Sequence, residues 1–129
     1  MGTFRDLIVY KKSFSLAMEI FELTKLFPVE ERYALTSQIR RSSRSVNRSI
    51  GEGYRKRRYP NHFINKITDA DMENTETQIS LDFAHACNYI TDEINMELRG
   101  KSEEIGRLLN HMIENPEKYQ RKTDTARKN

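Results

Sequence analysis

Residues 35–50 of the chain read LTSQIRRSSRSVNRSI. Apolar or small residues recur there at steps of four, four, three and four, at Leu35, Ile39, Ser43, Val46 and Ile50. Because an α-helix turns by about 100° per residue, this spacing returns to one side of the helix and leaves the arginines on the opposite side. We therefore predict an amphipathic helix from about Glu31 to Ile50, with a narrow apolar face and a break that begins at Gly51.

Three more stretches have helical spacing, and breaks rich in turn residues separate them. They extend over about residues 4–26, about residues 61–89, and from a Thr91 cap to about Met112. The 129 residues include only five Gly and three Pro, with no Gly-rich phosphate loop and no alternating strand pattern. We predict an all-α fold, an antiparallel up-and-down four-helix bundle, over residues 1–116. A basic, disordered tail is expected over residues 117–129.

The first and third predicted helices carry apolar residues on two sides. In the first, one stripe consists of Leu7, Tyr10, Phe14, Ala17, Met18 and Phe21, and the other of Val9, Leu16, Ile20 and Leu23. In the third, one stripe consists of Met72, Ile79, Phe83, Ala86 and Ile90, and the other of Phe63, Ile67, Ala70, Leu81 and Ala84. Polar residues such as Asn74 interrupt the last stripe, which we therefore interpret as a contact surface that is only partly dry.

A small bundle needs only one apolar face, about 100° wide, on each helix. Every helix of a four-helix chain lies at the periphery, so a second stripe either meets a second subunit or remains as scattered surface residues. We predict that the chain forms a homo-oligomer, with scattered exposure as the alternative.

Composition excludes several classes of protein. Apolar residues make up 36% and charged residues 32% of the sequence, the mean hydropathy is −0.81, and no apolar run reaches the length of about 20 residues that a membrane span needs. The single cysteine, Cys87, cannot form an intramolecular disulfide. The start of the chain lacks the long apolar region of a signal peptide. We expect a cytoplasmic protein without a membrane partner.

The net charge of +3 conceals an uneven distribution. Between residues 40 and 58, eight basic residues stand against one acid, Glu52, which gives a net charge of +7. The candidate nucleic-acid-binding residues are Arg40, Arg41, Arg44, Arg48, Arg55, Lys56, Arg57 and Arg58. Seven are arginines, whose planar guanidinium group suits bidentate contact with phosphate. Tyr54 and Tyr59 flank the basic loop and either stack on unpaired bases or anchor the loop.

The chain also contains other partners for these arginines. Between Asp69 and Glu104, ten acids stand against two basic residues, a net charge of −8. Arg40 and Arg41 therefore bind either phosphate or carboxylates of the third helix, within one subunit or across an interface. The residues of the loop, Arg55 to Arg58, are the stronger nucleic-acid candidates.

No catalytic constellation stands out in the sequence. The histidines, His62, His85 and His111, are scattered, and the i, i+2 spacing of His85 and Cys87 places them on different sides of a helix. Asp69, Glu73 and Glu76 share a helix face, but the Glu-x-x-His pairs of helical carboxylate metal sites are missing. We expect a protein that is not an enzyme and has no cofactor or metal.

Several short motifs occur in an order that resembles a known family. They are FRDLIVYKKS at residues 4–13, Phe27-Pro28, Gln38-Ile39-Arg40-Arg41, Glu52-Gly53 and Glu76-Thr77-Gln78. Over about residues 4–114 this combination resembles the "four helix bundle protein" family, whose founding members are encoded by intervening sequences within bacterial 23S ribosomal RNA genes. Departures from the usual pattern, at Ser42, Ser43, Gly51 and Ala70-Asp71, leave the branch of the family open.

The resemblance implies a fold, an assembly and a class of function. Members of the family are up-and-down four-helix bundles that form ring-like pentamers, without known catalytic activity and with an expected role in nucleic-acid binding. A similar branch, the accessory variability proteins of diversity-generating retroelements, binds template RNA and a reverse transcriptase. We expect a non-enzymatic, oligomeric accessory protein that binds RNA or DNA. The alternative is a protein-interaction scaffold, such as a reverse-transcriptase accessory subunit, whose arginines form ion pairs.

Overall fold

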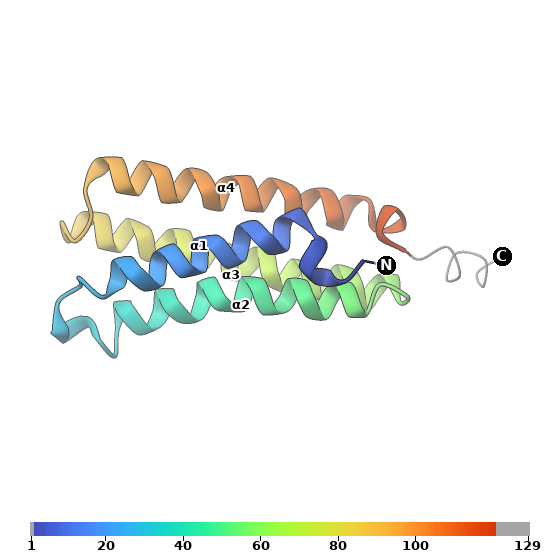
Figure 1. The fold of residues 1–129 in the computed structure, drawn as a ribbon, viewed down its shortest axis with the longest axis horizontal. Coiled ribbons are helices and arrows are strands. Elements are labelled where there is room, and N and C mark those ends of the chain that lie inside the picture. The colour runs from blue at the N-terminus through green and yellow to red at the C-terminus, as the bar shows by residue number, and fades with distance from the viewer. Residues whose placement is uncertain (1, 121–129) are drawn as a thin grey trace.

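The fold consists of four α-helices in a computed structural model that describes residues 2–120 (Figure 1). The helices are α1 (Ile8–Thr24), α2 (Leu35–Arg55), α3 (Pro60–Ala86) and α4 (Asp92–Glu114), with short 3-10 turns η1 (Phe4–Asp6), η2 (Val29–Glu31) and η3 (Pro116–Tyr119). Residues 2–120 contain no strand, so the expected all-α fold is confirmed. None of the four helices combines the length and apolar character that crossing a bilayer requires.

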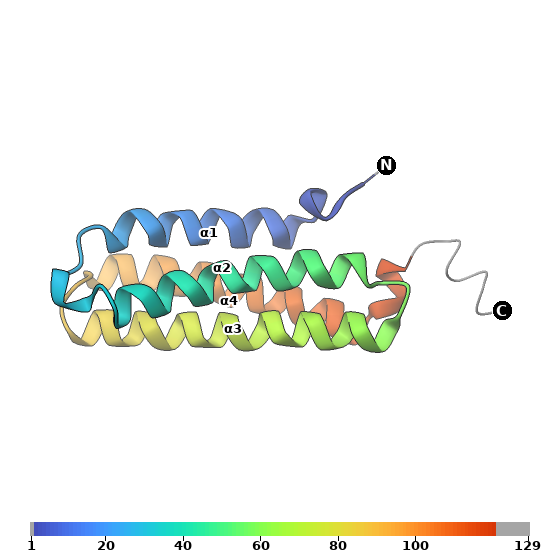
Figure 2. The ribbon, with the colours of Figure 1, turned by 90° about the horizontal axis from the view of Figure 1, so that it is seen from below.

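The four helices lie side by side, and after each connection the next helix takes the chain back to the other end of the molecule (Figures 1 and 2). α2 packs most extensively on α3, α3 also packs on α4, and α1 contacts both α2 and α4. The start of the chain, the α2–α3 connection and the end of α4 therefore gather at one end (Figure 2). One hydrophobic core of buried residues from all four helices fills the space between them.

On α1 and on α3, one apolar stripe faces the core and the other faces outward. The interpretation of one α3 stripe from the sequence was wrong. The α3 stripe of Phe63, Ile67, Ala70, Leu81 and Ala84, expected to be partly dry, is fully buried in the core. Met72, Ile79 and Phe83 of the other stripe remain 54%, 48% and 60% exposed. On α1, Val9, Leu16 and Ile20 are buried, whereas Phe14 and Met18 are about half exposed.

Buried polar side chains explain why the interrupted stripe of α3 enters the core. Asn74 donates through Nδ2 to the Ser102 carbonyl at 2.9 Å and accepts from the Ser102 hydroxyl at 2.8 Å. The Thr77 and Ser42 hydroxyls lie 2.8 Å apart, which joins α3 to α2. Because these groups are hydrogen-bonded, their burial does not incur the penalty of an unsatisfied polar atom.

Both ends of α2 differ from the prediction. The helix begins at Leu35, not at Glu31, because Glu31 ends a 3-10 turn and its carboxylate accepts the Leu35 N–H at 3.3 Å. It continues through Gly51 to Arg55 instead of breaking. At Gly53 a Cβ atom would lie 2.8 Å from Ile67 Cδ1, so the glycine permits close contact between α2 and α3. Gly53 therefore serves helix packing and does not terminate the helix.

The end of the described chain packs on the bundle. Residues Glu117–Tyr119, which we expected to begin a disordered tail, belong to η3. The Tyr119 ring stacks on Phe63 at a centroid distance of 5.8 Å, so this turn covers one end of the core. The rest of the predicted tail, residues 121–129, lies outside the described residues.

Candidate nucleic-acid interface

The arginines of α2 form a row along its outward side. Arg41, Arg44, Arg48 and Arg55 are exposed, while the opposite side of the helix buries Ile39, Val46 and Ile50. The row lies between α1 and α3. Arg40 contacts α1 at Thr24, and the charge of Arg41 acts on Glu73 of α3. The amphipathic pattern of the sequence thus orients α2 as predicted.

Arg40 is held against α1 by a hydroxyl and an aromatic ring. Its Nε donates to Thr24 Oγ1 at 2.7 Å, and its guanidinium lies 4.9 Å from the centroid of the Phe21 ring. The Arg44 guanidinium lies over the same ring at 5.5 Å. A cation over an aromatic face is attracted by the ring quadrupole, so Phe21 orients two members of the row.

None of seven basic residues of the band forms an ion pair with a carboxylate within residues 2–120: Arg40, Arg41, Arg44, Arg48, Arg55, Lys56 and Arg57. Acids of α1, α3 and α4 instead pair with other cations, as in Lys12–Glu104, Lys101–Glu19 and Arg99–Asp82. Arg40 and Arg41 thus form no ion pair with a carboxylate inside the described subunit, although the charge of Arg41 acts on Glu73 of α3. Pairing across an interface remains a prediction.

One end of the bundle is basic, and it includes an arginine that the sequence pattern did not indicate, Arg5. A cavity of about 520 Å³ is lined by Gly2, Thr3, Phe4, Arg5, Tyr54, Arg55, Arg57, Arg58 and Tyr59. Arg48 joins Arg5 and Arg55 around an adjoining hollow of about 440 Å³. We call Arg5, Arg48, Arg55, Arg57 and Arg58 the basic end. Arg5 lies far from the others in sequence and reaches them only because η1 packs against α2, so no local signal identifies it.

The two tyrosines near the basic end differ in accessibility. Arg57 donates from Nη1 to the Tyr54 carbonyl at 2.9 Å and lies 3.7 Å from the Tyr54 ring centroid, so this tyrosine anchors the loop. Tyr59 is 55% exposed and contacts His62 edge-on at 5.8 Å. Of the two stacking candidates from the sequence, Tyr59 is the one with a largely open ring.

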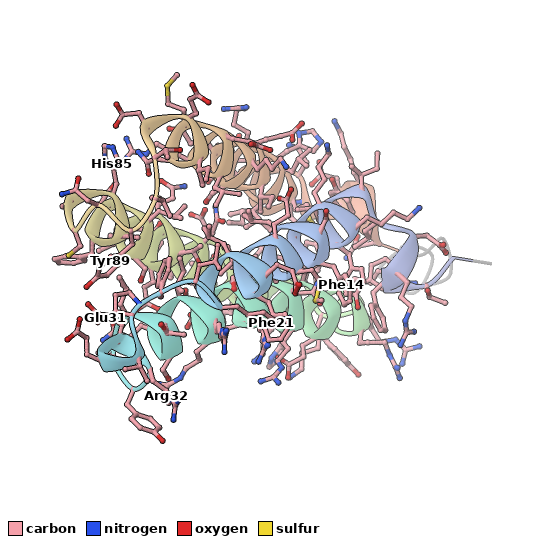
Figure 3. The ribbon with its side chains drawn as sticks, turned by 60° about the vertical axis from the view of Figure 1, so that its left-hand side comes forward. Phe14, Phe21, Glu31, Arg32, His85 and Tyr89 are labelled. Atoms are coloured by element: carbon pink, nitrogen blue, oxygen red, sulfur yellow. The ribbon has the colours of Figure 1, made fainter. Side chains whose placement is uncertain are left out.

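The remaining candidate catalytic and metal-binding side chains do not come together in the described chain. His85 lies at the other end of the bundle (Figure 3) and pairs with Asp92 at 2.5 Å. His111 lies against the Tyr119 ring. Cys87 is exposed. In the part of the chain that the structure describes, no three His, Cys, Asp or Glu side chains gather closely enough to hold a metal ion.

The surroundings of Glu73, an acid on the outer side of α3, alter its titration. Its partial burial raises the pKa of its carboxyl, and the neighbouring Glu76 raises it further, whereas Arg41 opposes the shift. Asp69, Glu73 and Glu76 form no ion pair among the described residues. These three carboxylates thus form an acidic surface on α3 that makes no ion pair among the described residues, although the charge of Arg41 acts on Glu73.

Comparisons with known proteins agree with this architecture. The family described as 23S rRNA-intervening sequence protein matches residues 5–111. A crystal structure of a protein with unknown function from the S23 ribosomal protein family of Bacteroides thetaiotaomicron is 30% identical, with a TM-score of 0.75. The match covers 83% of this chain and 96% of that one. No curated protein matches the sequence. The chain therefore belongs to the family of 23S rRNA-intervening sequence proteins.

Proposed function

We propose that the protein is a non-enzymatic, oligomeric accessory protein that binds RNA through the basic end, which includes Arg48 and Arg55 of α2. One observation carries this proposal: seven basic residues of the band have no carboxylate partner within residues 2–120. Exposed guanidinium groups in a row suit contacts to successive phosphates, which dominate nucleic-acid affinity.

The dimensions of the row suit a short stretch of nucleic acid. Arg48 and Arg55 are seven residues apart on one helix, which corresponds to about 10.5 Å at 1.5 Å per residue. At about 3.4 Å per nucleotide along one strand, this distance spans on the order of three nucleotides. Every subunit of an oligomer would repeat the row.

The aromatic neighbour favours single-stranded over double-stranded RNA. Unpaired bases stack on exposed aromatic side chains, whereas the base faces of a duplex are covered. Tyr59 offers an exposed ring beside Arg57 and Arg58 at the cavity of the basic end. We therefore propose a single-stranded segment as the preferred ligand.

A salt titration with two matched double variants tests this proposal. Fluorescence anisotropy with a labelled 20-nucleotide single-stranded RNA of mixed sequence measures affinity between 50 and 300 mM salt. The unmodified chain should bind with a steep salt dependence, and Arg48→Gln/Arg55→Gln should lower the slope of log K against log salt by about 1.4, or about 0.7 for each lost phosphate contact. Lys11→Gln/Arg107→Gln removes the same charge from exposed positions of α1 and α4 and should change the slope little. Absence of binding at 50 mM salt, or equal losses in the two variants, would overturn the proposal.

Self-association is the second part of the proposal. We place the chain as an antiparallel up-and-down bundle in a ring-like homo-oligomer in the cytoplasm. The exposed apolar residues of α1 and α3 support the assembly, because such side chains gain by leaving water. The mass of the chain in solution by light scattering tests it, and a monomer of 15.3 kDa at all concentrations would contradict it.

The exposed apolar residues also favour a second candidate function. In this alternative the protein is an interaction scaffold, such as an accessory subunit of a reverse transcriptase, and Arg40 and Arg41 form ion pairs across an interface. Arg40→Glu/Arg41→Glu would then dissociate the assembly, and the unmodified chain would not bind the RNA at 50 mM salt. RNA binding by the unmodified chain that is weakened in Arg48→Gln/Arg55→Gln would instead favour the first function.

A further inference from the structure

Two outward faces of the molecule combine apolar side chains with charge of opposite sign. The α1/α2 face consists of Phe14, Met18 and Phe21 of α1 together with Arg40 and Arg44 of α2. The α3 face consists of Met72, Ile79 and Phe83 together with Asp69, Glu73 and Glu76. Figure 3 shows Phe14 and Phe21 on the same side of α1.

The exposure of these side chains is greater than a monomer needs. Phe14 is 51% and Met18 46% exposed on the first face, and Met72, Ile79 and Phe83 are 54%, 48% and 60% exposed on the second. These are large side chains that follow each other along a helix, not isolated surface residues. Each face therefore has the apolar centre of an interface.

The two faces also match in spacing. Phe14, Met18 and Phe21 are separated by four and three residues, the spacing of coiled-coil contact positions. Met72 and Ile79 are separated by seven residues, as are Phe14 and Phe21, and Phe83 follows one turn later. Seven residues of helix correspond to about 10.5 Å. Aligned helices would thus bring two apolar side chains of each face together.

The charges beside the apolar centres are complementary. Arg40 and Arg44 border the first face, and neither forms an ion pair with a carboxylate of the described chain. Asp69, Glu73 and Glu76 border the second face and likewise have no cationic partner there. Each face would repel a copy of itself and attract the other, because like charges across an interface are costly and opposite charges select the partner.

We propose that the α1/α2 face of one copy docks onto the α3 face of the next copy. This proposal rests on the self-association proposed above and names the surfaces that carry it. Since the two faces are different surfaces of the chain, the contact is heterologous, and its repetition gives a ring when the rotation between copies closes. A second copy is the favoured occupant, because the complementary face is present on the chain itself.

This docking divides the arginines between two roles. Arg40 and Arg44 lie at the interface, where they meet the carboxylates of the neighbouring α3. The basic end remains outside it and binds RNA. In a closed ring, rotation about the single axis places the basic ends of all copies at the same height.

Two double variants, mixed, test which faces meet. Phe14→Gln/Met18→Gln disables the α1/α2 face, and Ile79→Gln/Phe83→Gln disables the α3 face. Each variant alone should sediment as a folded monomer of 15.3 kDa, because it lacks one of the two surfaces. Mixed in equal amounts, they should form a dimer of twice that mass and nothing larger, since only one intact pair of faces remains. Circular dichroism checks that each variant keeps its helix content.

The matched control is Leu26→Gln/Tyr33→Gln. These residues are 83% and 88% exposed but lie outside both faces, so their replacement should leave the full assembly in place. Homodimers from either variant alone, or a mixture that stays monomeric, would overturn the proposal. Loss of assembly in the control would overturn it as well. If the unmodified chain is itself a monomer, the proposed self-association fails; if it assembles and the variants do too, only the choice of faces fails.

Discussion

The outer side of α2 and the outer side of α3 are built from opposite kinds of residue. On α2 the exposed positions are arginines and the buried ones apolar, so the sequence pattern alone distinguishes inside from outside. On α3 both sides are apolar, and the stripe interrupted by Asn74 is the buried one. The arginines identify the outward side of α2 from the sequence. An amide such as that of Asn74 does not identify an outward side, because it can enter the core when it has a partner such as Ser102.

The largest expected contrast lies between the two sides of α3. Phe63 is 1% exposed and Phe83 is 60% exposed. Phe63→Ala should lower the free energy of unfolding by about 3–5 kcal/mol, because it opens a cavity in the core. Phe83→Ala should change the stability of a dilute, monomeric sample by less than about 0.5 kcal/mol. Urea denaturation measures both, and similar losses would show that the sides of α3 are wrongly assigned.

The glycines of α2 should respond in opposite directions. Gly53→Ala should destabilise the fold by about 1–3 kcal/mol, because the new Cβ would lie 2.8 Å from the buried Ile67 Cδ1. Gly51→Ala should stabilise it by about 0.5–1 kcal/mol, because the nearest contact, with Phe4, is an ordinary 3.5 Å. Thermal unfolding of the two variants compares them directly. A stabilising Gly53→Ala would contradict the close packing of α2 on α3.

Replacement of Arg40 and replacement of Arg44 should affect the stability of the fold differently. Arg40→Gln removes the hydrogen bond to Thr24 and should lower the free energy of unfolding by about 1 kcal/mol. Arg44→Gln removes a charge that is exposed and unpaired in the subunit, so its effect on stability should stay below about 0.5 kcal/mol. Equal effects in chemical denaturation of the monomer would refute this distinction.

The smallest effect on stability is expected for Tyr89, at the end of the bundle opposite the basic end. The Tyr89 hydroxyl donates to Glu31 Oε2 at 2.8 Å, and this bond to a carboxylate raises the pKa of Tyr89 to about 12 (Figure 3). A raised phenol pKa means that the bond stabilises the fold below the ordinary value near 10, and that this contribution is lost as the pH rises through 12.

An ultraviolet titration of the folded protein measures the same group. Tyr89→Phe should remove the absorbance step near pH 12 and slightly lower stability at neutral pH. An unchanged titration curve in the variant would contradict the hydrogen bond to Glu31.

Much of the fold could be predicted from the residue pattern. Four helices follow from periodicity, and the apolar face of α2 follows from Leu35, Ile39, Val46 and Ile50. The end of α2 was mispredicted because a glycine can serve a helix contact as well as a break, and only the position of Ile67 distinguishes the two. The orientation of α3 was mispredicted because the partner of Asn74, Ser102, lies on another helix.

The candidate site was predictable only in its local part. The band from Arg40 to Arg58 is contiguous in sequence, so counting charges finds it. Arg5 was missed because it reaches the band through the packing of η1 on α2. The roles of Tyr54 and Tyr59 could not be separated either, because the position of Arg57 over the Tyr54 ring depends on the folded loop.

Sedimentation velocity of the protein with a fluorescent 20-nucleotide single-stranded RNA shows whether RNA binding and assembly occur together. RNA binds the basic end and the α1/α2 face forms the subunit contact, so the two events should be compatible. The RNA should sediment with an assembly no smaller than that of the protein alone. RNA that travels with a monomer, or that breaks up the assembly as it binds, would contradict this expectation.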